Sequence, residues 1–303
     1  MNIKNKLKKK WEIWYFYMTV KQFVNKYSFL GNKGYRINKT KQKFLKKMGY
    51  SLNLDNPKTF NEKTQWIKYN PSENMSVLAD KYLVREYVKK KVGDKYLNEL
   101  LGVWNNANKI NFGKLPDRFV LKTNHACGSN FIANDKNKMK TSLIKKKLNG
   151  WLKINYGVTS GEEHYKKIKP LIVAEKYLED GDGDLLDYKI FCSNGKVKYI
   201  QIDVDRFTNH TRCFYDTSWN KQEFTLGFPF FKGEVRKPKN LKEMIIVAEK
   251  LSKDFPMVRV DLYNIDGKII FGEMTFTHGS GFEQFSPKEW DLKFGEEFDL
   301  NIR

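Results

Sequence analysis

The sequence predicts an α+β protein whose N-terminal part is helical. Hydrophobic residues make up 40% of its 303 residues and aromatic residues 15%, which is enough apolar surface for a core and too much for a disordered chain. Up to about residue 115 the apolar side chains follow a helical period, and after Pro116 the pattern changes to short β-rich runs separated by helical stretches.

This change of pattern divides the chain into three predicted regions: a basic and aromatic segment at 1–50, a helical subdomain at 51–115 and an α+β domain at 116–303. In the helical subdomain Asn61 is a candidate N-cap, and the apolar spacing predicts one helix over 74–92. The later helices are predicted at 140–156 and 241–255. The predicted strands are 118–123, 171–178, 186–191, 196–204, 258–263 and 268–274.

Positive charge is concentrated near the N-terminus. The net formal charge is +21, and the first 50 residues hold 14 basic residues against one acid, Glu12. A concentrated excess of this kind favours an anionic surface as a partner, whereas a nucleic-acid reader more often spreads its charge over one face of a folded domain. The rest of the sequence carries no nucleic-acid-binding motif, so nucleic acid is not an expected partner.

The segment Trp11–Val20 is apolar and aromatic, and it follows five lysines within residues 1–10. It is shorter than the ~20 apolar residues that a membrane-spanning helix needs, and no small-residue cleavage site follows it. Two interpretations fit the segment equally well. Either the lysines and rings form an anchor on an anionic membrane surface, or an amphipathic helix packs on the body of the protein beside a solvated lysine tract.

The cysteines are odd in number and have no paired spacing, which argues against a disulfide framework and favours a reducing compartment. The expected location is therefore the cytoplasm, at the inner face of the cell membrane if the N-terminal segment is an anchor. The histidines show no zinc-ligand spacing among themselves or with the cysteines.

The segment 258–275 predicts a β-hairpin that carries acidic residues. A three-residue loop ending at Gly267 would pair Arg259 with Glu273. Asp261 would then be the diagonal neighbour of Glu273 on the same face, and both carboxylates could reach one cation. Two oxygen donors beside a guanidinium suit Mg²⁺ bound to nucleotide phosphates, although a simple cross-strand ion pair explains the pattern equally well.

Two other segments place polar residues on or beside predicted strands. Lys122 lies on a strand that runs into a small-residue loop at Gly128 and Ser129, where backbone N–H groups can approach phosphate oxygens. This segment is neither a P-loop nor a dinucleotide fingerprint. Further along, strand alternation puts Asp187 and Lys189 on one face.

The order of these segments resembles a known family. The strand lysine with its loop, I-V-A-E-K-Y-L at 172–178, D-Y-K at 187–189, V-R-V-D at 258–261 and G-E-M-T at 272–275 are similar to the motifs of ATP-grasp ligases. More narrowly, the chain resembles the TupA-like ATP-grasp family of teichuronopeptide biosynthesis. This resemblance is carried by F-V-L-K-T-N-H at 119–125, Y-I-Q-I-D-V-D-R-F-T-N-H-T-R at 199–212 and F-G-E-M-T-F-T-H-G-S-G-F at 271–282. It covers roughly residues 53–295 and implies an ATP-grasp fold.

The resemblance also implies roles for individual residues. Arg259 would be catalytic and stabilise charge on the transferred phosphoryl group, while Asp261 and Glu273 would hold Mg²⁺. Two residues after this glutamate the family often has Asn, and this chain has Thr275, whose hydroxyl can still coordinate a metal. The residues implied to bind ATP are Lys122, Gly128, Ser129, Glu175, Lys176, Tyr177, Asp187 and Lys189.

The segment 203–212 supports two interpretations. Read as Asp-Val-Asp, its first three residues match the short metal motif of nucleotide-sugar glycosyltransferases. Under the ATP-grasp resemblance, Arg206, His210 and Arg212 would instead face an anionic acceptor, because arginine suits carboxylate and phosphate groups.

The leading hypothesis is an ATP- and Mg²⁺-dependent carboxylate–amine ligase that activates its carboxylate as an acyl phosphate. The resemblance implies a role in cell-surface or capsular polysaccharide synthesis, with an acidic sugar or an amino acid as substrate. A nucleotide-sugar glycosyltransferase is the alternative, and a nucleotide-binding protein without turnover is a third interpretation.

Overall fold

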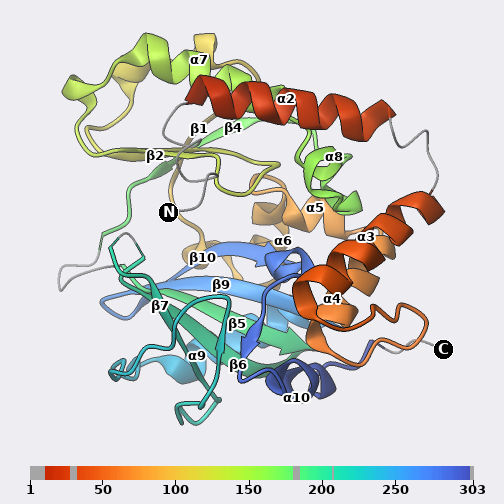
Figure 1. Ribbon diagram of the computed structural model, residues 1–303. Coiled ribbons are helices and arrows are strands. Elements are labelled where there is room, and N and C mark those ends of the chain that lie inside the picture. The colour runs from red at the N-terminus through yellow and green to blue at the C-terminus, as the bar shows by residue number, and fades with distance from the viewer. Residues whose placement is uncertain (1–10, 28–32, 180–184, 207, 301–303) are drawn as a thin grey trace. The chain divides into compact units, whose positions relative to one another are not determined.

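The structure is a computed structural model that describes residues 11–27, 33–179, 185–206 and 208–300 (Figure 1). The lysine tract at residues 1–10 lies outside the described residues. The chain forms two compact units, each assembled from segments that are distant in the sequence. The first unit comprises Met1–Thr40, Glu73–Leu83 and Asn98–Tyr177, and the second Lys41–Ser72, Val84–Leu97 and Leu178–Arg303. The division near residue 115 suggested by the sequence does not coincide with these units.

The first unit contains a four-stranded antiparallel sheet of order β1-β4-β2-β3. Its strands are β1 (Leu100–Trp104), β2 (Phe119–Thr123), β3 (Asn130–Ala133) and β4 (Ile172–Lys176). Its helices are α2 (Trp11–Tyr27), α5 (Met75–Ala79), α7 (Thr141–Leu152), α8 (Tyr156–Ser160) and the first half of α3 (Lys33–Met48). Short 3₁₀ turns are η2 (Ala107–Lys109), η3 (Phe112–Lys114), η4 (Lys136–Lys138) and η5 (Glu163–Tyr165). Strands β1 and β3 were not predicted from the sequence.

Helix α7 covers one face of this sheet. Buried side chains alternate along β2, so that Phe119 and Leu121 point into the core and pack with Leu148 and Trp151 of the helix. The helix expected over 140–156 ends earlier. Asn155 starts a separate short helix, α8, because its side chain accepts a hydrogen bond from the Val158 N–H at 3.1 Å.

Helix α2 packs on the first unit along one side. The ring of Trp11 meets that of Trp151 edge-on, with 6.3 Å between centroids. Further along the helix, the Gln22 side chain accepts a hydrogen bond from the backbone N–H of Asn155 at 2.5 Å, and Asn25 donates to the Val158 carbonyl at 3.0 Å. None of the helices in the described part of the chain combines the length and hydropathy that crossing a bilayer requires.

The second unit contains a five-stranded antiparallel sheet of order β10-β9-β5-β6-β7 and a two-stranded sheet of β11 and β8. Its strands are β5 (Asp187–Ser193), β6 (Lys196–Val204), β7 (Thr211–Tyr215), β8 (Thr225–Leu226), β9 (Val258–Ile265), β10 (Lys268–Thr275) and β11 (Phe285–Ser286). Its helices are α4 (Phe60–Tyr69), α6 (Val84–Val92), α9 (Leu241–Ser252), α10 (Trp290–Glu296) and the second half of α3, with 3₁₀ turns η1 (Asp94–Tyr96) and η6 (His278–Gly281).

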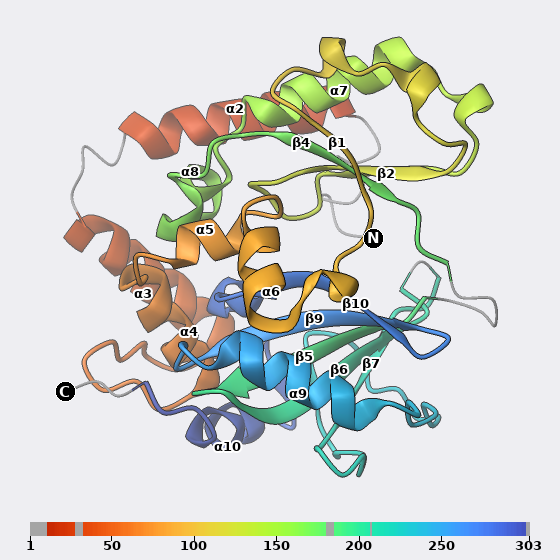
Figure 2. The same cartoon turned by 180° about the vertical axis from the view of Figure 1, so that it is seen from behind.

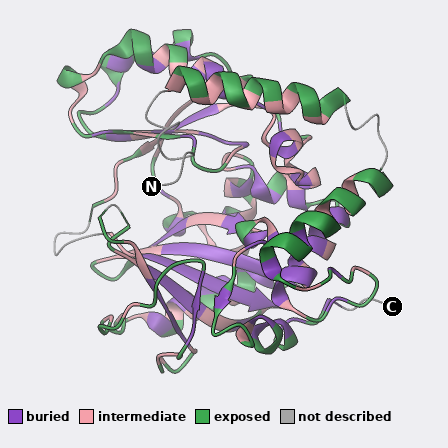
Figure 3. Ribbon diagram, viewed as in Figure 1, coloured by how far each residue is buried: buried purple, intermediate pink, exposed green. Residues whose placement is uncertain are grey.

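The two faces of the five-stranded sheet differ in character. Helix α9 lies against one face, next to β5, β6 and β9 (Figure 2). On the other face, a cluster of aromatic rings brings α4 and α10 onto β5. Every residue of β5 is buried, and the burial colouring shows how much of this sheet is buried (Figure 3). The rest of that second face carries charged side chains.

Two helix boundaries differ from the sequence prediction. Thr59, not Asn61, caps α4, in a capping box with Glu62. The single helix expected over 74–92 is two helices, because the buried carboxylate of Asp80 accepts hydrogen bonds from the backbone N–H groups of Tyr82 and Leu83 at 2.8 and 3.2 Å. A side chain that binds the backbone in this way replaces the helical hydrogen bonds and ends α5.

The aromatic cluster should be a main contributor to the stability of the second unit. Phe294 is fully buried, and its ring lies 4.9 Å from that of Phe60 and 5.3 Å from that of Phe191. We expect Phe294→Ala to lower the free energy of unfolding by about 3–5 kcal/mol, measured by urea denaturation. Leu292→Ala is the matched control, because this side chain of the same helix is 45% exposed and should change stability by less than about 0.5 kcal/mol.

Candidate active site

The hairpin of β9 and β10 has a tighter turn than the sequence suggested. Ile265 pairs with Lys268, so the loop consists of the two residues Asp266 and Gly267. Both have positive φ angles, 49° and 82°, as a type I′ hairpin turn requires. The predicted three-residue loop is therefore wrong. The paired strands extend one residue closer to the turn than expected.

A β-bulge further along the hairpin shifts the pairing again. The register changes between Phe271 and Glu273, and beyond this point Asp261 lies opposite Glu273. The expected pairing of Arg259 with Glu273 is thus wrong. The prediction that Arg259, Asp261 and Glu273 share one face is nevertheless correct. The turn and the bulge each shift the register by one residue. Because side chains alternate between the two faces of a strand, two such shifts restore the original face. The bulge falls at Gly272, where a Cβ would lie 3.1 Å from the Asp261 carbonyl oxygen.

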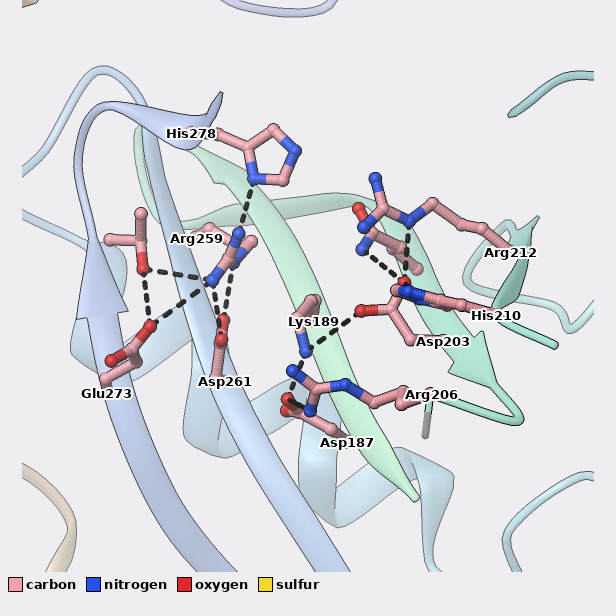
Figure 4. A network of polar contacts seen from close by, with 12 residues as sticks. Asp187, Lys189, Asp203, Arg206, His210, Arg212, Arg259, Asp261, Glu273 and His278 are labelled. Carbon is pink, nitrogen blue, oxygen red and sulfur yellow. Dashed lines mark hydrogen bonds and ion pairs between the residues drawn. The ribbon is translucent and has the colours of Figure 1, made fainter. Parts of the chain in front are cut away.

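Arg259 is the centre of the polar face of this hairpin (Figure 4). Its Nε and Nη2 atoms donate to the two carboxylate oxygens of Asp261 at 2.6 and 2.7 Å, which is a bidentate pair. Its Nη2 also lies 3.4 Å from Glu273 Oε1 and 3.1 Å from Thr275 Oγ1. Although burial works against the charge, attraction by Asp261 and Glu273 raises the pKa of Arg259 above its usual range. The structure thus brings together the four residues predicted for catalysis and metal binding.

The oxygen donors around Arg259 fit Mg²⁺ by their chemistry. Mg²⁺ is commonly held by one or two carboxylates together with substrate phosphates, and Asp261 and Glu273 supply two carboxylates from neighbouring strands. Burial raises the pKa of Asp261 against the attraction of Arg259, so a bound cation would favour its charged form. Among the residues that the structure describes, no three His, Cys, Asp or Glu side chains gather into a metal site.

A second group of charges lies on the same face of the sheet, next to the hairpin. Lys189 pairs in register with Asp261, and its ammonium group donates to Asp187 and lies 3.5 Å from Asp203 Oδ2. The guanidinium of Arg206 donates to Asp187 Oδ2 at 2.9 Å. The other oxygen of Asp187 is buried and has no hydrogen-bond partner among the described residues. Such an orphaned acceptor inside a cationic cluster is available to a ligand donor.

Asp203 holds the predicted acceptor-binding residues in place. Its Oδ1 accepts a hydrogen bond from Arg212 Nε at 2.6 Å and lies 3.3 Å from His210 Nε2. Although burial alone would raise it, the attraction of Arg212 and Lys189 holds the pKa of Asp203 well below its usual range. The two acids of the Asp-Val-Asp motif lie in different surroundings, because Asp203 is buried among these cations and Asp205 lies exposed on a turn with a φ of 53°.

His278 and Glu283 join the two groups of charges, and the sequence analysis did not identify either residue. Arg259 Nη1 donates to His278 Nδ1, and His278 Nε2 lies 3.0 Å from Glu283 Oε2. Because an arginine can only donate, Nδ1 must be the acceptor and Nε2 must carry the proton. Glu283 then accepts from Arg212 at 3.1 Å, and these two partners lower its pKa to about 2 despite burial. The sequence signal that could have identified His278 is its position in the T-H-G-S-G-F motif.

The first unit holds the other predicted nucleotide residues. Lys122 Nζ lies 2.9 Å from Glu175 Oε2, so two of the residues expected to bind ATP form an ion pair across β2 and β4. Gly128 has a φ of 73° in the turn between β2 and β3, with no atom within 4 Å of a Cβ built on it. The neighbouring Ser129 is buried and hydrogen-bonded to the side chain of Thr123. The loop is thus open at Gly128 and fixed at Ser129.

The two residues after Glu175 are placed differently from each other. The backbone N–H of Lys176 donates to the Glu99 carbonyl at 3.0 Å, and its carbonyl accepts from the Asn98 side chain at 2.9 Å. Both of its backbone groups therefore have partners within the sheet. The ring of Tyr177 faces the guanidinium of Arg118 at 4.1 Å from its centroid, so an adenine contact at this point would fall mainly on Tyr177.

The structure places most of the carboxylates and cations singled out by the ATP-grasp resemblance on one face of an antiparallel sheet. The family model described as TupA-like ATPgrasp matches residues 62–299, and the chain belongs to this family. The family predicted from the sequence motifs is thereby confirmed. No curated protein matched the chain.

Several solved structures are similar to this chain at low identity. The D-alanine–D-alanine ligase of Bacillus anthracis is 17% identical, with a TM-score of 0.42 and coverage of 67% of this chain and 58% of that chain. The D-alanine–D-alanine ligase of Helicobacter pylori is 14% identical, with a TM-score of 0.39 and coverage of 75% and 60%. The N5-carboxyaminoimidazole synthetase of Staphylococcus aureus complexed with ADP is 12% identical, with a TM-score of 0.38 and coverage of 66% and 44%. This chain thus spans about half the length of the structures it matches.

The anchoring role of Asp203 has a measurable pH dependence. We expect Asp203→Asn to lower the free energy of unfolding by about 3 kcal/mol at pH 7, because buried cations lose their charged partner. The folded-state pKa of Asp203 lies below the unfolded value of about 3.9, so its stabilisation is present above that pH and is lost as the pH falls.

Urea denaturation at pH 7 and pH 3 measures this effect. The difference between wild type and Asp203→Asn should shrink by about 1 kcal/mol at pH 3. Asp205→Asn is the matched control, because this exposed turn residue should change stability by less than about 0.5 kcal/mol at either pH. An Asp203→Asn protein as stable as wild type at pH 7 would contradict the anchoring role.

Proposed function

We propose that the protein is an ATP- and Mg²⁺-dependent ligase that joins a carboxylate to an amine. The observation that carries this proposal is the hairpin face on which Arg259 lies among Asp261, Glu273 and Thr275. Membership of an ATP-grasp family supports it, since the same residues fall in the matched segment. Ligases are also among the structurally similar proteins.

Each residue of the hairpin face has a distinct task in this proposal. Asp261 and Glu273 hold Mg²⁺, with the Thr275 hydroxyl as a further oxygen donor. The bound ion supplies charge neutralisation on the phosphate oxygens of ATP. Arg259 adds a fixed positive charge where negative charge develops during phosphoryl transfer, and its carboxylate partners keep it oriented before substrate arrives.

The nucleotide contacts are assigned by the same family membership. Lys122 and Lys189 neutralise phosphates, and the loop at Gly128 and Ser129 offers backbone N–H groups. Asp187, which is also assigned to the nucleotide, orients Lys189 and has an unpaired oxygen that can accept from a ligand hydroxyl. At the adenosine end, Glu175 binds the ribose hydroxyls, and Lys176 and Tyr177 contact the adenine.

The proposed reaction has two steps. A substrate carboxylate oxygen attacks the γ-phosphorus of ATP, the bond to the β-phosphate oxygen breaks, and ADP leaves. The amine nitrogen then attacks the carbonyl carbon of the acyl phosphate, phosphate leaves and the nitrogen loses a proton. The protein contributes by positioning the reactants and by neutralising charge.

An acidic sugar or an amino acid is the proposed substrate. Arg206 and Arg212 place guanidinium donors at one end of the site, beside the imidazole of His210, and guanidinium groups suit a carboxylate. The rings of Phe228 and His210 lie 3.8 Å apart, and Phe228 also lines a cavity with Gln222 and Thr225. This combination of an aromatic wall and polar groups can accommodate a polar acceptor larger than the carboxylate itself.

The proposed setting is the synthesis of a capsular or cell-wall polysaccharide. ATP is available in the cytoplasm, so the enzyme is placed there, at the inner face of the cell membrane where surface polymers are assembled. The alternative is a nucleotide-sugar glycosyltransferase, in which Asp203 and Asp205 would hold the metal.

Ligand specificity distinguishes the two functions. We expect ATP with Mg²⁺ to raise the melting temperature by several degrees, since a ligand at 100 times its Kd contributes about 2.7 kcal/mol to stability. UDP-sugars with Mn²⁺ should have no effect in the same thermal-shift titration. Stabilisation by a UDP-sugar without any by ATP would replace the ligase with the glycosyltransferase.

The metal assignment is tested by two conservative substitutions. We expect Glu273→Gln and Asp261→Asn each to lower ADP formation at least 100-fold while the far-UV circular dichroism stays that of wild type, because each removes a negatively charged oxygen donor. Asp266→Asn is the matched control in the same hairpin, since Asn also adopts the left-handed conformation of its turn. Full activity in either of the first two variants would remove the metal site from the proposal.

A further inference from the structure

Helix α2 has an exposed apolar side opposite the one that packs on the first unit. We call this side the outward stripe, and each of its side chains is between 44% and 71% exposed. It is visible as the exposed side of α2 in Figure 3. Its members are Ile13, Phe16, Tyr17, Val20, Phe23, Val24 and Tyr27.

The spacing of the outward stripe is helical throughout. Its members recur every three or four residues over the 17-residue helix, and at about 100° per residue they span a sector of roughly 120°. No polar residue of α2 falls inside this sector. Glu12, Thr19 and Lys26 border it on one edge and Lys21 lies beyond the other.

Such a stripe differs from the scattered apolar side chains of an ordinary surface. Single exposed hydrophobic residues are normal, whereas a contiguous row of rings and branched side chains marks a surface that binds something apolar. The packed side of α2 already anchors the helix through Trp11 and Gln22, so the outward stripe is not needed to hold α2 in place.

The charges around α2 identify the chemistry of the partner. The single acid of the helix, Glu12, is paired with Lys146 of α7 at 2.9 Å. Five lysines precede Trp11 in the sequence, and the first 50 residues have a net charge of +13. A second copy of the chain would bring an equally basic segment against this one, which like-charge repulsion opposes. An anionic surface with an apolar interior matches both the lysines and the stripe.

We propose that the outward stripe of α2 inserts into the surface of a bilayer containing anionic lipid, with the helix lying parallel to the membrane plane. The aromatic rings enter the boundary between headgroups and acyl chains, and the positive charge of the N-terminal sequence favours anionic headgroups. Helix α2 lies outside the residues that match the family model, so the family match says nothing of this surface. It specifies the membrane location given above and does not depend on the ligase reaction.

Co-sedimentation of the full-length protein with vesicles tests the proposal. We expect binding to phosphatidylcholine vesicles that contain 30% phosphatidylglycerol, at least tenfold weaker binding to pure phosphatidylcholine, and a steep decline between 50 and 500 mM salt. The triple variant Phe16→Ser, Val20→Ser, Phe23→Ser should bind anionic vesicles at least tenfold more weakly. Phe16→Ser alone should show a smaller loss in the same direction and is the second test if the triple variant is unstable.

A matched control and an independent activity assay complete the experiment. Ile246→Ser with Leu292→Ser removes two comparably exposed apolar side chains from α9 and α10 and should leave vesicle binding unchanged. ADP formation in vesicle-free solution should be the same in the stripe variants as in wild type. A wild-type protein that binds anionic vesicles but forms no ADP would refute the ligase and leave the membrane surface standing.

Three results would overturn the proposal. The first is a wild-type protein that does not bind anionic vesicles at low salt. The second is equal binding of the triple variant and wild type. The third is a wild-type protein that binds no vesicles but forms a concentration-dependent dimer in analytical ultracentrifugation, while the triple variant does not. This result would make the stripe an interface between copies of the chain.

Discussion

The buried guanidinium of Arg259 is the constraint on which the site depends. A buried charge is tolerated only when paired, and losing one partner of such a pair costs about 3–5 kcal/mol. Arg259 is 8% exposed and forms a bidentate pair with Asp261 on its own strand. Glu273 reaches it from the next strand only because the bulge at Gly272 turns that carboxylate onto the same face. The backbone irregularity and the charge pairing therefore depend on each other.

The pairing continues from Arg259 across the sheet through side chains with fixed donor and acceptor roles. His278 accepts from Arg259 and donates toward Glu283, and Glu283 accepts from Arg212. Arg212 in turn is held by Asp203. The proposed metal ligands and the proposed acceptor-binding residues thus belong to one network in which neighbours share partners. Substitutions within such a network are not additive in their effects on stability.

Much of the fold could be predicted because its signals are local. The six predicted strands are present within a few residues, since strands buried on one or both faces are rich in branched and aromatic side chains. The helix over 241–255 was also predicted from its apolar period and is α9. The common face of Arg259, Asp261 and Glu273 followed from strand alternation, even though both the turn and the register were wrong. Side-chain alternation has a period of two, so two register errors of one residue each leave the face unchanged.

By itself the sequence determined the family, the class of fold and the residues that carry charge on the hairpin, because short-range patterns and motifs encode these properties. Only the tertiary structure decided how those charges are paired. His278, Glu283 and the anchoring role of Asp203 depend on contacts between segments up to 71 residues apart, which no local pattern encodes. The tertiary structure likewise decided that α2 packs along one side and leaves an apolar stripe exposed along the other. Aromatic rings lie on both sides of α2, and the contacts of the helix with α7 and α8 decide which side is packed.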